Sequence, residues 1–271
     1  MDNHGSAARA AGRAVPFPAG PASMLRSLAV PGGAILACLL LLPSPRARAA
    51  DPDFLWNRLS QQCLPRYLAD HDPGPCARVD PERGYALYKV DGDRYQYLLL
   101  PTVRVTGIED ARLQAPDVPD YFQFAWQARA RVRERLGRPL PDTDVALTVN
   151  AANARSQNQL HIHVSCLKPA ARAVLGRLDA TRLGDGWFTL PEPLAGRRYE
   201  ARKLSAAQLA ATNLFALVGE HVAAGHRRLA YTGIALVNLA PDTFLVLEAT
   251  GGFWRGVPAE EIQDHACRIA Q

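Results

Sequence analysis

The chain has 271 residues, of which 48% are hydrophobic, so it is long enough to bury a sizeable core in one domain or two small lobes. Its formal net charge is +5, a value that by itself is compatible with nucleic-acid binding. Residues 1–49, however, hold five arginines against one aspartate, so +4 belongs to this segment and only +1 to the remainder. This distribution argues against a basic nucleic-acid interface.

The first 50 residues combine the features of a disordered leader and an export signal. Residues 1–23 are rich in Ala, Gly and Pro, which is typical of disorder. Arg26 then precedes an apolar run, Leu28–Leu42, and residues 47–49 have the small-x-small form of a secretory cleavage site. A proline and two glycines interrupt the run, which favours a cleaved signal peptide over a spanning helix.

Cysteine usage supports export. Cys38 lies in the apolar run, and Cys63, Cys76, Cys166 and Cys267 follow it. An even number of cysteines in an exported chain indicates two disulfides, although the sequence alone allows three connectivities. We predict Cys63–Cys76, which closes a short loop, and Cys166–Cys267, which ties a central strand to the C-terminal part. Four free buried thiols are the alternative.

The pattern after the leader predicts a helix followed by a hairpin. Phe54–Leu64 has its apolar residues on one side, as a helix does. Gly84–Val90 and Tyr95–Pro101 are predicted strands, joined by Asp91-Gly92-Asp93. An Asp-Gly pair between two apolar runs is a strong hairpin signal.

A second helix and strand lead to the central stretch of the chain. Tyr121–Leu136 is predicted to be helical, with Asp120 as its N-cap and Gly137 just past its end. Val145–Asn150 is the next predicted strand. The loop that follows, residues 151–158, is rich in small and amide residues and is expected to lie over a site.

The pattern weakens beyond Pro169. Strands and helices alternate there in a way that predicts a second α+β part packed on the first. The predicted helices are Leu175–Leu183, Ala206–Ala223 and Pro258–Ala270, and the predicted strands are Trp187–Leu190, Tyr199–Leu204, Tyr231–Leu239 and Thr243–Ala249.

The stretch from Arg155 to Cys166 carries the most chemistry because it alternates between apolar and polar residues. Its apolar members fall on one face of a strand. Its polar members, which fall on the other face, are Gln159, His161, His163 and Ser165. The two imidazoles therefore project the same way, about 7 Å apart along the strand.

Three interpretations compete for this polar row. A solvated strand face is the simplest, although two histidines flanked by amides make it less attractive. His161 and His163 are also suitable as two ligands of a zinc site, which requires a distant third ligand. Finally, one imidazole can act as a nucleophile whose neighbours hold its tautomer and charge.

The segment Leu160–Val164 resembles the end of the histidine-triad motif of nucleotide hydrolases and transferases. Tyr97–Pro101 resembles the earlier core strand of that superfamily, and Val145–Asn150 resembles the strand whose Asn contacts the ribose or the catalytic row. Residues 55–271 more closely resemble the bacterial CDP-diacylglycerol pyrophosphatases, a membrane-anchored branch. The matching pieces are Cys63-Leu64-Pro65, Gln96–Thr102, Ala125–Arg129, Gln157-Asn158, His161-Ile162-His163 and Glu260–His265.

This resemblance implies an α+β fold with a histidine-triad-like antiparallel sheet and packed helices. The core would cover about residues 84–168, and a C-terminal α+β extension would cover 169–271, within one domain of residues 51–271. The implied reaction is hydrolysis of CDP-diacylglycerol to CMP and phosphatidate, with no cofactor and no metal. The resemblance also implies an uncleaved N-terminal anchor in the inner membrane, a periplasmic domain and contact with the lipid surface.

The resemblance also assigns roles to individual residues. His161 would be the nucleophile and His163 would donate to the phosphoryl oxygens. Gln159 stands where the motif has its first histidine, so the proton donor of that position is missing. The expected substrate-binding residues are Gln159, Asn150, Asn158, Gln157, Arg155 and Arg104.

Three other functions remain open from the sequence. One is a histidine-triad pyrophosphatase or nucleotidyl transferase that acts on soluble substrates, and dependence on acyl chains distinguishes it. Another is an exported zinc-dependent hydrolase, which is distinguished by sensitivity to chelators. The third is a non-catalytic, exported ligand-binding module, for which His161→Ala should spare activity altogether. The sequence leaves the oligomeric state undetermined.

Overall fold

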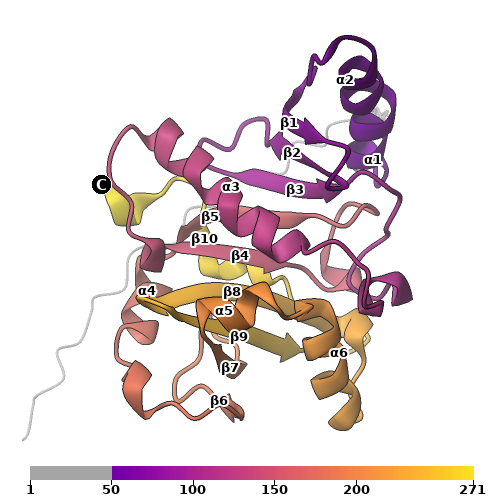
Figure 1. Cartoon of the computed structure of the whole chain (residues 1–271). Coiled ribbons are helices and arrows are strands. Elements are labelled where there is room, and N and C mark those ends of the chain that lie inside the picture. Colours follow the sequence, from indigo (N-terminus) through magenta and orange to yellow (C-terminus); the bar gives the residue numbers. More distant parts are fainter. Residues whose placement is uncertain (1–50) are drawn as a thin grey trace, which may run out of the picture. The chain divides into compact units, whose positions relative to one another are not determined.

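A computed structural model of the chain describes residues 51–271, which form one antiparallel sheet with helices on both faces (Figure 1). The predicted leader and signal or anchor segment lie outside the described residues. The α+β class with a large antiparallel sheet is confirmed. Among residues 51–271, no helix is both long enough and apolar enough to cross a bilayer.

The sheet has ten strands in the order β1-β2-β3-β5-β4-β8-β9-β7-β6, and β10 pairs with β5 off this path. The strands are β1 (Cys76–Asp80), β2 (Tyr85–Lys89), β3 (Tyr97–Pro101), β4 (Val145–Val149), β5 (Ile162–Leu167), β6 (Trp187–Thr189), β7 (Glu200–Leu204), β8 (Thr232–Ala240), β9 (Thr243–Thr250) and β10 (Gln263–Asp264). The predicted β2–β3 hairpin is confirmed, and the two strands predicted over Tyr231–Leu239 and Thr243–Ala249 form a second hairpin, β8–β9. The strands of the C-terminal part continue the same sheet through the β4–β8 pair.

Short helices and turns connect the strands. The helices are α1 (Phe54–Arg58), a π-helical turn (Leu59–Cys63), α2 (Leu64–Asp70), α3 (Tyr121–Leu136), α4 (Pro169–Leu175), α5 (Ala206–Ala210) and α6 (Leu214–Ala224). Helix α3 has the predicted bounds because Asp120 accepts a hydrogen bond from the Gln123 N–H and Gly137 adopts a left-handed φ of 68°.

Other helix predictions were wrong in extent or in kind. The first helical segment continues through a π-helical turn to Asp70. The predicted helix Ala206–Ala223 is broken at Asn213, whose side chain caps α6 by accepting from two backbone N–H groups. The helix predicted over Leu175–Leu183 lies earlier in the chain. Pro169 occupies the first turn of α4, a position that suits proline, and α4 ends at Leu175.

The predicted last helix, Pro258–Ala270, does not form. A 3-10 turn at Ala259–Ile262 leads instead to β10, and a second one covers Arg268–Ala270. Gln263 and Asp264 pair with Leu167 and Cys166 of β5. Pairing with the central strand therefore prevails over local helix propensity here, which tertiary contacts commonly do.

Helices and turns cover both faces of the sheet. Figure 1 shows α3 crossing β3, β5 and β4, and α3 and α6 pack on the face that carries Ile162 and Val164. The other face has two covers. α1 and the π-helical turn pack over β2 and β3, while α4 and Ile262 pack over β4, β8 and β9. Strand alternation places His161 and His163 on this second face, at the junction of the two covers.

Two disulfides tie flanking segments to the sheet, one on each face. Cys63–Cys76 joins the π-helical turn to β1, and Cys166–Cys267 joins β5 to the segment after β10, across 101 residues of chain. Both predicted pairings are confirmed. A loop of that length corresponds to roughly 4–5 kcal/mol of loop-closure entropy in the unfolded chain, so the second bridge stabilises the arrangement substantially.

Thiol titration tests this pairing in solution. Full-length protein unfolded without reductant is expected to show at most one reactive thiol, that of Cys38, because the other four are bonded. The same sample is expected to show four additional thiols after reduction. Four or more reactive thiols before reduction would contradict both bridges.

Candidate functional site

A cavity of about 500 Å³ opens where the two covers meet, over the polar face of β5. One wall is apolar and comes from α1, β2 and β3, with Phe54, Leu55, Tyr88 and Leu98. The polar residues that line the cavity are Asp91, Asp93, Gln96, Ser156, Gln157, His161, His163, Glu260 and His265. Apolar walls with a few convergent polar groups are typical of a ligand site.

Strand β5 and the residue just before it position the two histidines. β5 lies between β3 and β4, and His163 is directly opposite Leu98 on one side and Thr148 on the other. His161 directly precedes β5. Both imidazoles are buried, and their ring centroids are 4.9 Å apart. Of the polar row predicted from the sequence, the two histidines line the cavity and the other two members are fully buried, so the interpretation of a solvated strand face was wrong.

The backbone fixes the tautomer of His161. Its Nδ1 lies 2.6 Å from the carbonyl oxygen of Gln159. A carbonyl only accepts, so Nδ1 carries the proton and Nε2 keeps a lone pair. Burial is the largest cause that lowers the pKa of His161, to about 3, and the nearby charge of His163 acts in the same direction. His161 is therefore neutral and nucleophilic at Nε2 at ordinary pH.

A carboxylate and an amide hold His163. Glu260 Oε2 lies 3.0 Å from Nδ1 of His163, and the side-chain amide of Gln96 lies 2.8 Å from the same nitrogen. The other ring nitrogen, Nε2, is buried and has no hydrogen-bond partner among residues 51–271. A buried polar atom without a partner at a cavity wall is where a ligand atom is expected to bind.

Glu260 is held in its ionised state. Burial opposes ionisation, but the hydrogen bond with His163 and the charges of both imidazoles lower the pKa of Glu260 to about 2. A side-chain hydrogen bond from Asn150 also lowers this pKa, and Asn150 Oδ1 separately accepts from the Glu260 backbone N–H at 3.1 Å. The carboxylate is thus placed to stabilise a positive charge on His163.

The sequence did not assign roles to Glu260, Gln96 or His265, which the fold brings to the same cavity. His265 Nε2 lies 3.3 Å from the Gln96 amide nitrogen, and its Nδ1 lies 3.6 Å from a carboxylate oxygen of Asp93. Burial lowers the pKa of His265. These residues were included in the resemblance or lay near it, but no local spacing relates them to His163.

Several predicted binding residues are engaged elsewhere. Gln159 donates to the carbonyls of Pro101 and Val103, which fixes the loop after β3. Gln157 accepts from the Leu55 N–H and donates to Asp51, so it joins α1 to the cavity rim. These contacts give Gln159 and Gln157 a structural role at the site.

The two predicted arginines form ion pairs. Arg155 makes two hydrogen bonds to Glu109, at 2.7 and 2.6 Å, and is almost fully buried. Arg104 pairs with Asp53 near the surface. Neither arginine lines the cavity. Asn158 does not line it either, and its backbone N–H donates to Pro52.

The burial of the Arg155–Glu109 pair predicts a stability effect. Arg155→Met is expected to lower the free energy of unfolding by about 2–3 kcal/mol, because it leaves a half-buried carboxylate without its partner. Arg104→Met, which breaks an exposed pair, is the matched control and is expected to change stability by about 0–1 kcal/mol. Urea unfolding measures both, and equal effects of the two substitutions would contradict the assignment.

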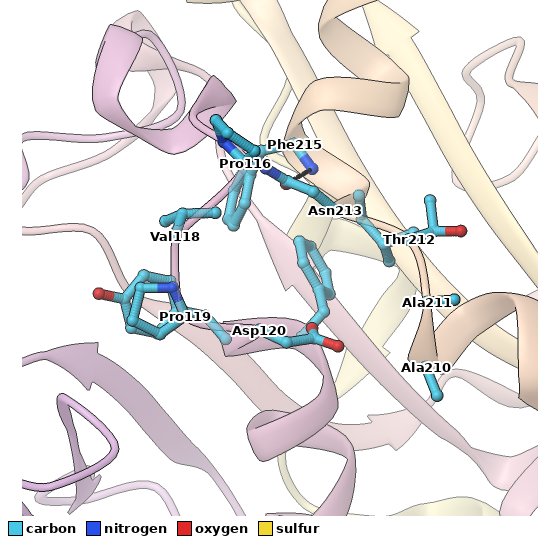
Figure 2. A pocket seen from close by; sticks show the side chains of 12 residues that line it. Pro116, Val118, Pro119, Asp120, Ala210, Ala211, Thr212, Asn213 and Phe215 are labelled. Carbon is cyan, nitrogen blue, oxygen red and sulfur yellow. Dashed lines mark hydrogen bonds between the residues drawn. The ribbon is translucent and has the colours of Figure 1, made fainter.

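Other features of the described residues carry less chemistry. Within residues 51–271, no three His, Cys, Asp or Glu side chains are grouped as a metal site requires. Figure 2 shows a smaller cavity, of about 180 Å³, on the α3 and α6 face of the sheet. Asp120 is the carboxylate in its lining, and it caps α3. The cavity over β5, which groups three histidines with Glu260, is therefore the candidate site.

Comparison with known proteins agrees with this site. Residues 50–271 match the family model described as CDP-diacylglycerol pyrophosphatase. The chain belongs to this family. A CDP-diacylglycerol pyrophosphatase of Mycobacterium tuberculosis is 39% identical over 252 residues, which cover 90% of this chain and 96% of that protein. A probable CDP-diacylglycerol pyrophosphatase of Mycobacterium leprae is 38% identical over 245 residues, or 90% and 91% of the two chains. Membership in this family makes the chain an enzyme that acts on a phosphoric anhydride.

Proposed function

We propose that this chain hydrolyses CDP-diacylglycerol to CMP and phosphatidate through a covalent CMP–His161 intermediate, and that its sheet is a histidine-triad-like core with a C-terminal extension. Family membership supports the substrate class. The observation that carries the mechanism is the state of His161, whose proton is held on Nδ1 by Gln159 while Nε2 is free in a buried, cavity-lining ring.

The first step forms one bond and breaks another. The lone pair of His161 Nε2 attacks the phosphorus that bears cytidine, and the anhydride bond to phosphatidate breaks. Phosphatidate leaves with the bond electrons. The Nδ1 proton stays hydrogen-bonded to the Gln159 carbonyl, which stabilises the positive ring while the nitrogen–phosphorus bond exists.

The second step returns the enzyme to its starting state. Water attacks the same phosphorus, the nitrogen–phosphorus bond breaks, and CMP is released. His163 is the proposed donor to the phosphoryl oxygens through Nε2, with Glu260 as its counter-charge at 3.0 Å. Phosphoryl transfer depends mostly on positioning and charge stabilisation, which these fixed groups supply.

His265 and Asp93 are the proposed replacement for the missing first histidine of the triad. Gln159 fixes the backbone of a loop and cannot transfer a proton. His265 lines the same cavity and lies beside Gln96, and Asp93 faces its other nitrogen. His265 is therefore assigned to give a proton to the leaving phosphate in the first step and to take one back from the attacking water in the second.

We further propose that the enzyme works at the inner membrane, with its folded part in the periplasm. The apolar run of residues 28–42 supports an N-terminal anchor or export signal. Two disulfides in the folded part support an oxidising compartment. A diacyl substrate stays in the bilayer, so an enzyme held at the surface meets it there.

The experiment that tests this function uses full-length protein with radiolabelled CDP-diacylglycerol in mixed micelles. Wild type is expected to release CMP and phosphatidate with undiminished turnover in EDTA, because the proposed steps use protein groups alone. Loss of activity in EDTA with recovery on adding zinc would favour a zinc-dependent hydrolase. Equal turnover of CDP esters without acyl chains would favour a soluble-substrate pyrophosphatase.

A further inference from the structure

Two aromatic side chains project into solvent at a tight turn after β9. Phe253 is 66% exposed and Trp254 is 92% exposed, and their rings contact each other edge to face at a centroid distance of 4.9 Å. Large apolar side chains are seldom this exposed, and two adjacent ones form a protruding apolar tip. We define Gly251–Gly256 as the aromatic turn.

The aromatic turn is rigidly built. Gly252 and Arg255 exchange both backbone hydrogen bonds, at 3.0 and 3.1 Å, so Phe253 and Trp254 are the two central residues. The side chain of Asn153 donates to the carbonyls of Gly252 and Phe253. A Cβ on Gly251 would collide with the Arg255 carbonyl, and one on Gly256 would collide with the Asn153 side chain. The fold therefore holds the two rings outward rather than leaving them on a loose loop.

The segments that hold the aromatic turn in place also connect it to the catalytic cavity. Asn153 lies in the loop between β4 and β5, and Gln157 of that loop lines the cavity. One residue past the turn, the Val257 carbonyl accepts from the Ala151 N–H. Glu260 follows three residues later. The position of the aromatic tip is thus mechanically linked to both sides of the site.

We propose that the aromatic turn inserts into the interfacial region of a lipid bilayer and presents the cavity to a lipid substrate. The substrate part of this proposal rests on the proposed function. Trp is enriched at membrane interfaces, because its ring is apolar with one polar edge. Arg255 at the turn and Arg228, whose guanidinium lies 5.5 Å from the Tyr231 ring, add basic charge for lipid phosphates. Residues 251–257 contain no acidic side chain.

The size of the tip favours a lipid surface over a protein partner. Two aromatic side chains provide roughly 300–500 Å² of buriable area. A stable protein interface needs about 800 Å² on each partner, with surrounding complementarity. A short protruding tip fits a fluid interface, where insertion depth and not shape matching determines binding.

Quenching by brominated lipids tests insertion directly. Full-length wild type and Trp254→Ala are incubated with vesicles of phosphatidylcholine and phosphatidylglycerol that carry bromine near the headgroup. Subtracting the two emission signals isolates Trp254, and its fluorescence is expected to be quenched at least twofold by these vesicles. Absence of a quenched component would overturn the proposal. So would shielding of Trp254 that needs no vesicles and grows with protein concentration, which indicates a second copy of the chain.

Kinetics test the consequence for the substrate. The double variant Phe253→Ser/Trp254→Ser is expected to lower kcat/KM on CDP-diacylglycerol in vesicles on the order of tenfold, while turnover of a CDP ester without acyl chains is unchanged. Leu68→Ser, which removes another exposed apolar side chain, is the matched control and is expected to leave both values unchanged. An unchanged vesicle kcat/KM in the double variant would overturn the proposal. If wild type turned over neither substrate, the proposed function would fail, and quenching alone would decide insertion.

Discussion

Replacement of His161 by alanine is expected to lower kcat for CDP-diacylglycerol by about 10⁴-fold or more, because it removes the Nε2 whose lone pair is fixed by the hydrogen bond of Nδ1 to the Gln159 carbonyl. KM is expected to change little, since the ring contributes to bond formation more than to substrate binding. The measurement is CMP release from radiolabelled substrate under steady-state conditions.

Trapping of the intermediate gives a second readout. Substrate labelled at the cytidine-bearing phosphorus is expected to leave radioactivity on wild type after an alkaline quench, since phosphohistidine survives alkali, and none on His161→Ala. His226→Asn is the matched control, because His226 is exposed with a φ of 54°, which Asn tolerates, and full activity is expected. A labelled His161→Ala protein would assign the nucleophile to another residue.

Glu260→Gln is expected to lower kcat by about 100-fold or more, with the protein still folded. The carboxylate is the counter-charge of His163, and an amide of the same shape keeps the packing but removes that charge. A split between kcat and KM separates this role from a structural one. KM is expected to change little in Glu260→Gln, because the lost charge acts on the phosphoryl group mainly in the transition state.

The pH dependence of kcat in wild type follows from the states of Glu260 and His161. The pKa of Glu260 is about 2 and that of His161 about 3, so both groups keep their working states as pH falls from 7 to 4. Neither is expected to produce an acid limb of kcat in that range. Glu261→Gln is the matched control, because Glu261 pairs with Arg197 and does not line the cavity. Equal losses in Glu260→Gln and Glu261→Gln would show that the effect is not specific to the His163 pair.

The same two groups also govern acid stability. Both folded-state pKa values lie below their ordinary values of 6.5 and 4.5, so the unfolded chain binds more protons as the solution becomes acidic. The free energy of unfolding therefore falls as the solution becomes more acidic. For His161 the fall begins below about pH 6.5 and for Glu260 below about pH 4.5, and it continues towards their folded pKa values. Stability is therefore highest on the neutral side of this window.

Local patterns were sufficient for the elements whose signals are local. The alternation around His161 and His163, the Asp-Gly turn of the β2–β3 hairpin and the caps of α3 all appear within a few residues of the element that they define. The two disulfide pairings were also predicted, because one closes a short loop and the other was the remaining pair.

Long-range partners were not predictable in this way. Glu260 reaches His163 only because β10 pairs with β5, and that pairing replaces a helix that the local pattern favours. Arg155 was expected to bind substrate. Its partner Glu109 lies 46 residues away, and no pattern in the sequence relates the two. Tertiary contacts therefore determine where these side chains lie and what they bind.

The crossing of β10 onto β5 also sets the time at which the site is assembled. The Gln263 side chain donates to the His163 carbonyl across 100 residues of chain, and Cys267 bonds Cys166 across 101. At about 5–20 residues per second, a ribosome needs roughly 5–20 s to make that stretch. During this interval the nascent chain has His161 and His163 but lacks the Glu260 carboxylate and the bridge. The surroundings of His163 are therefore complete only after the C-terminal part has been synthesised and has docked.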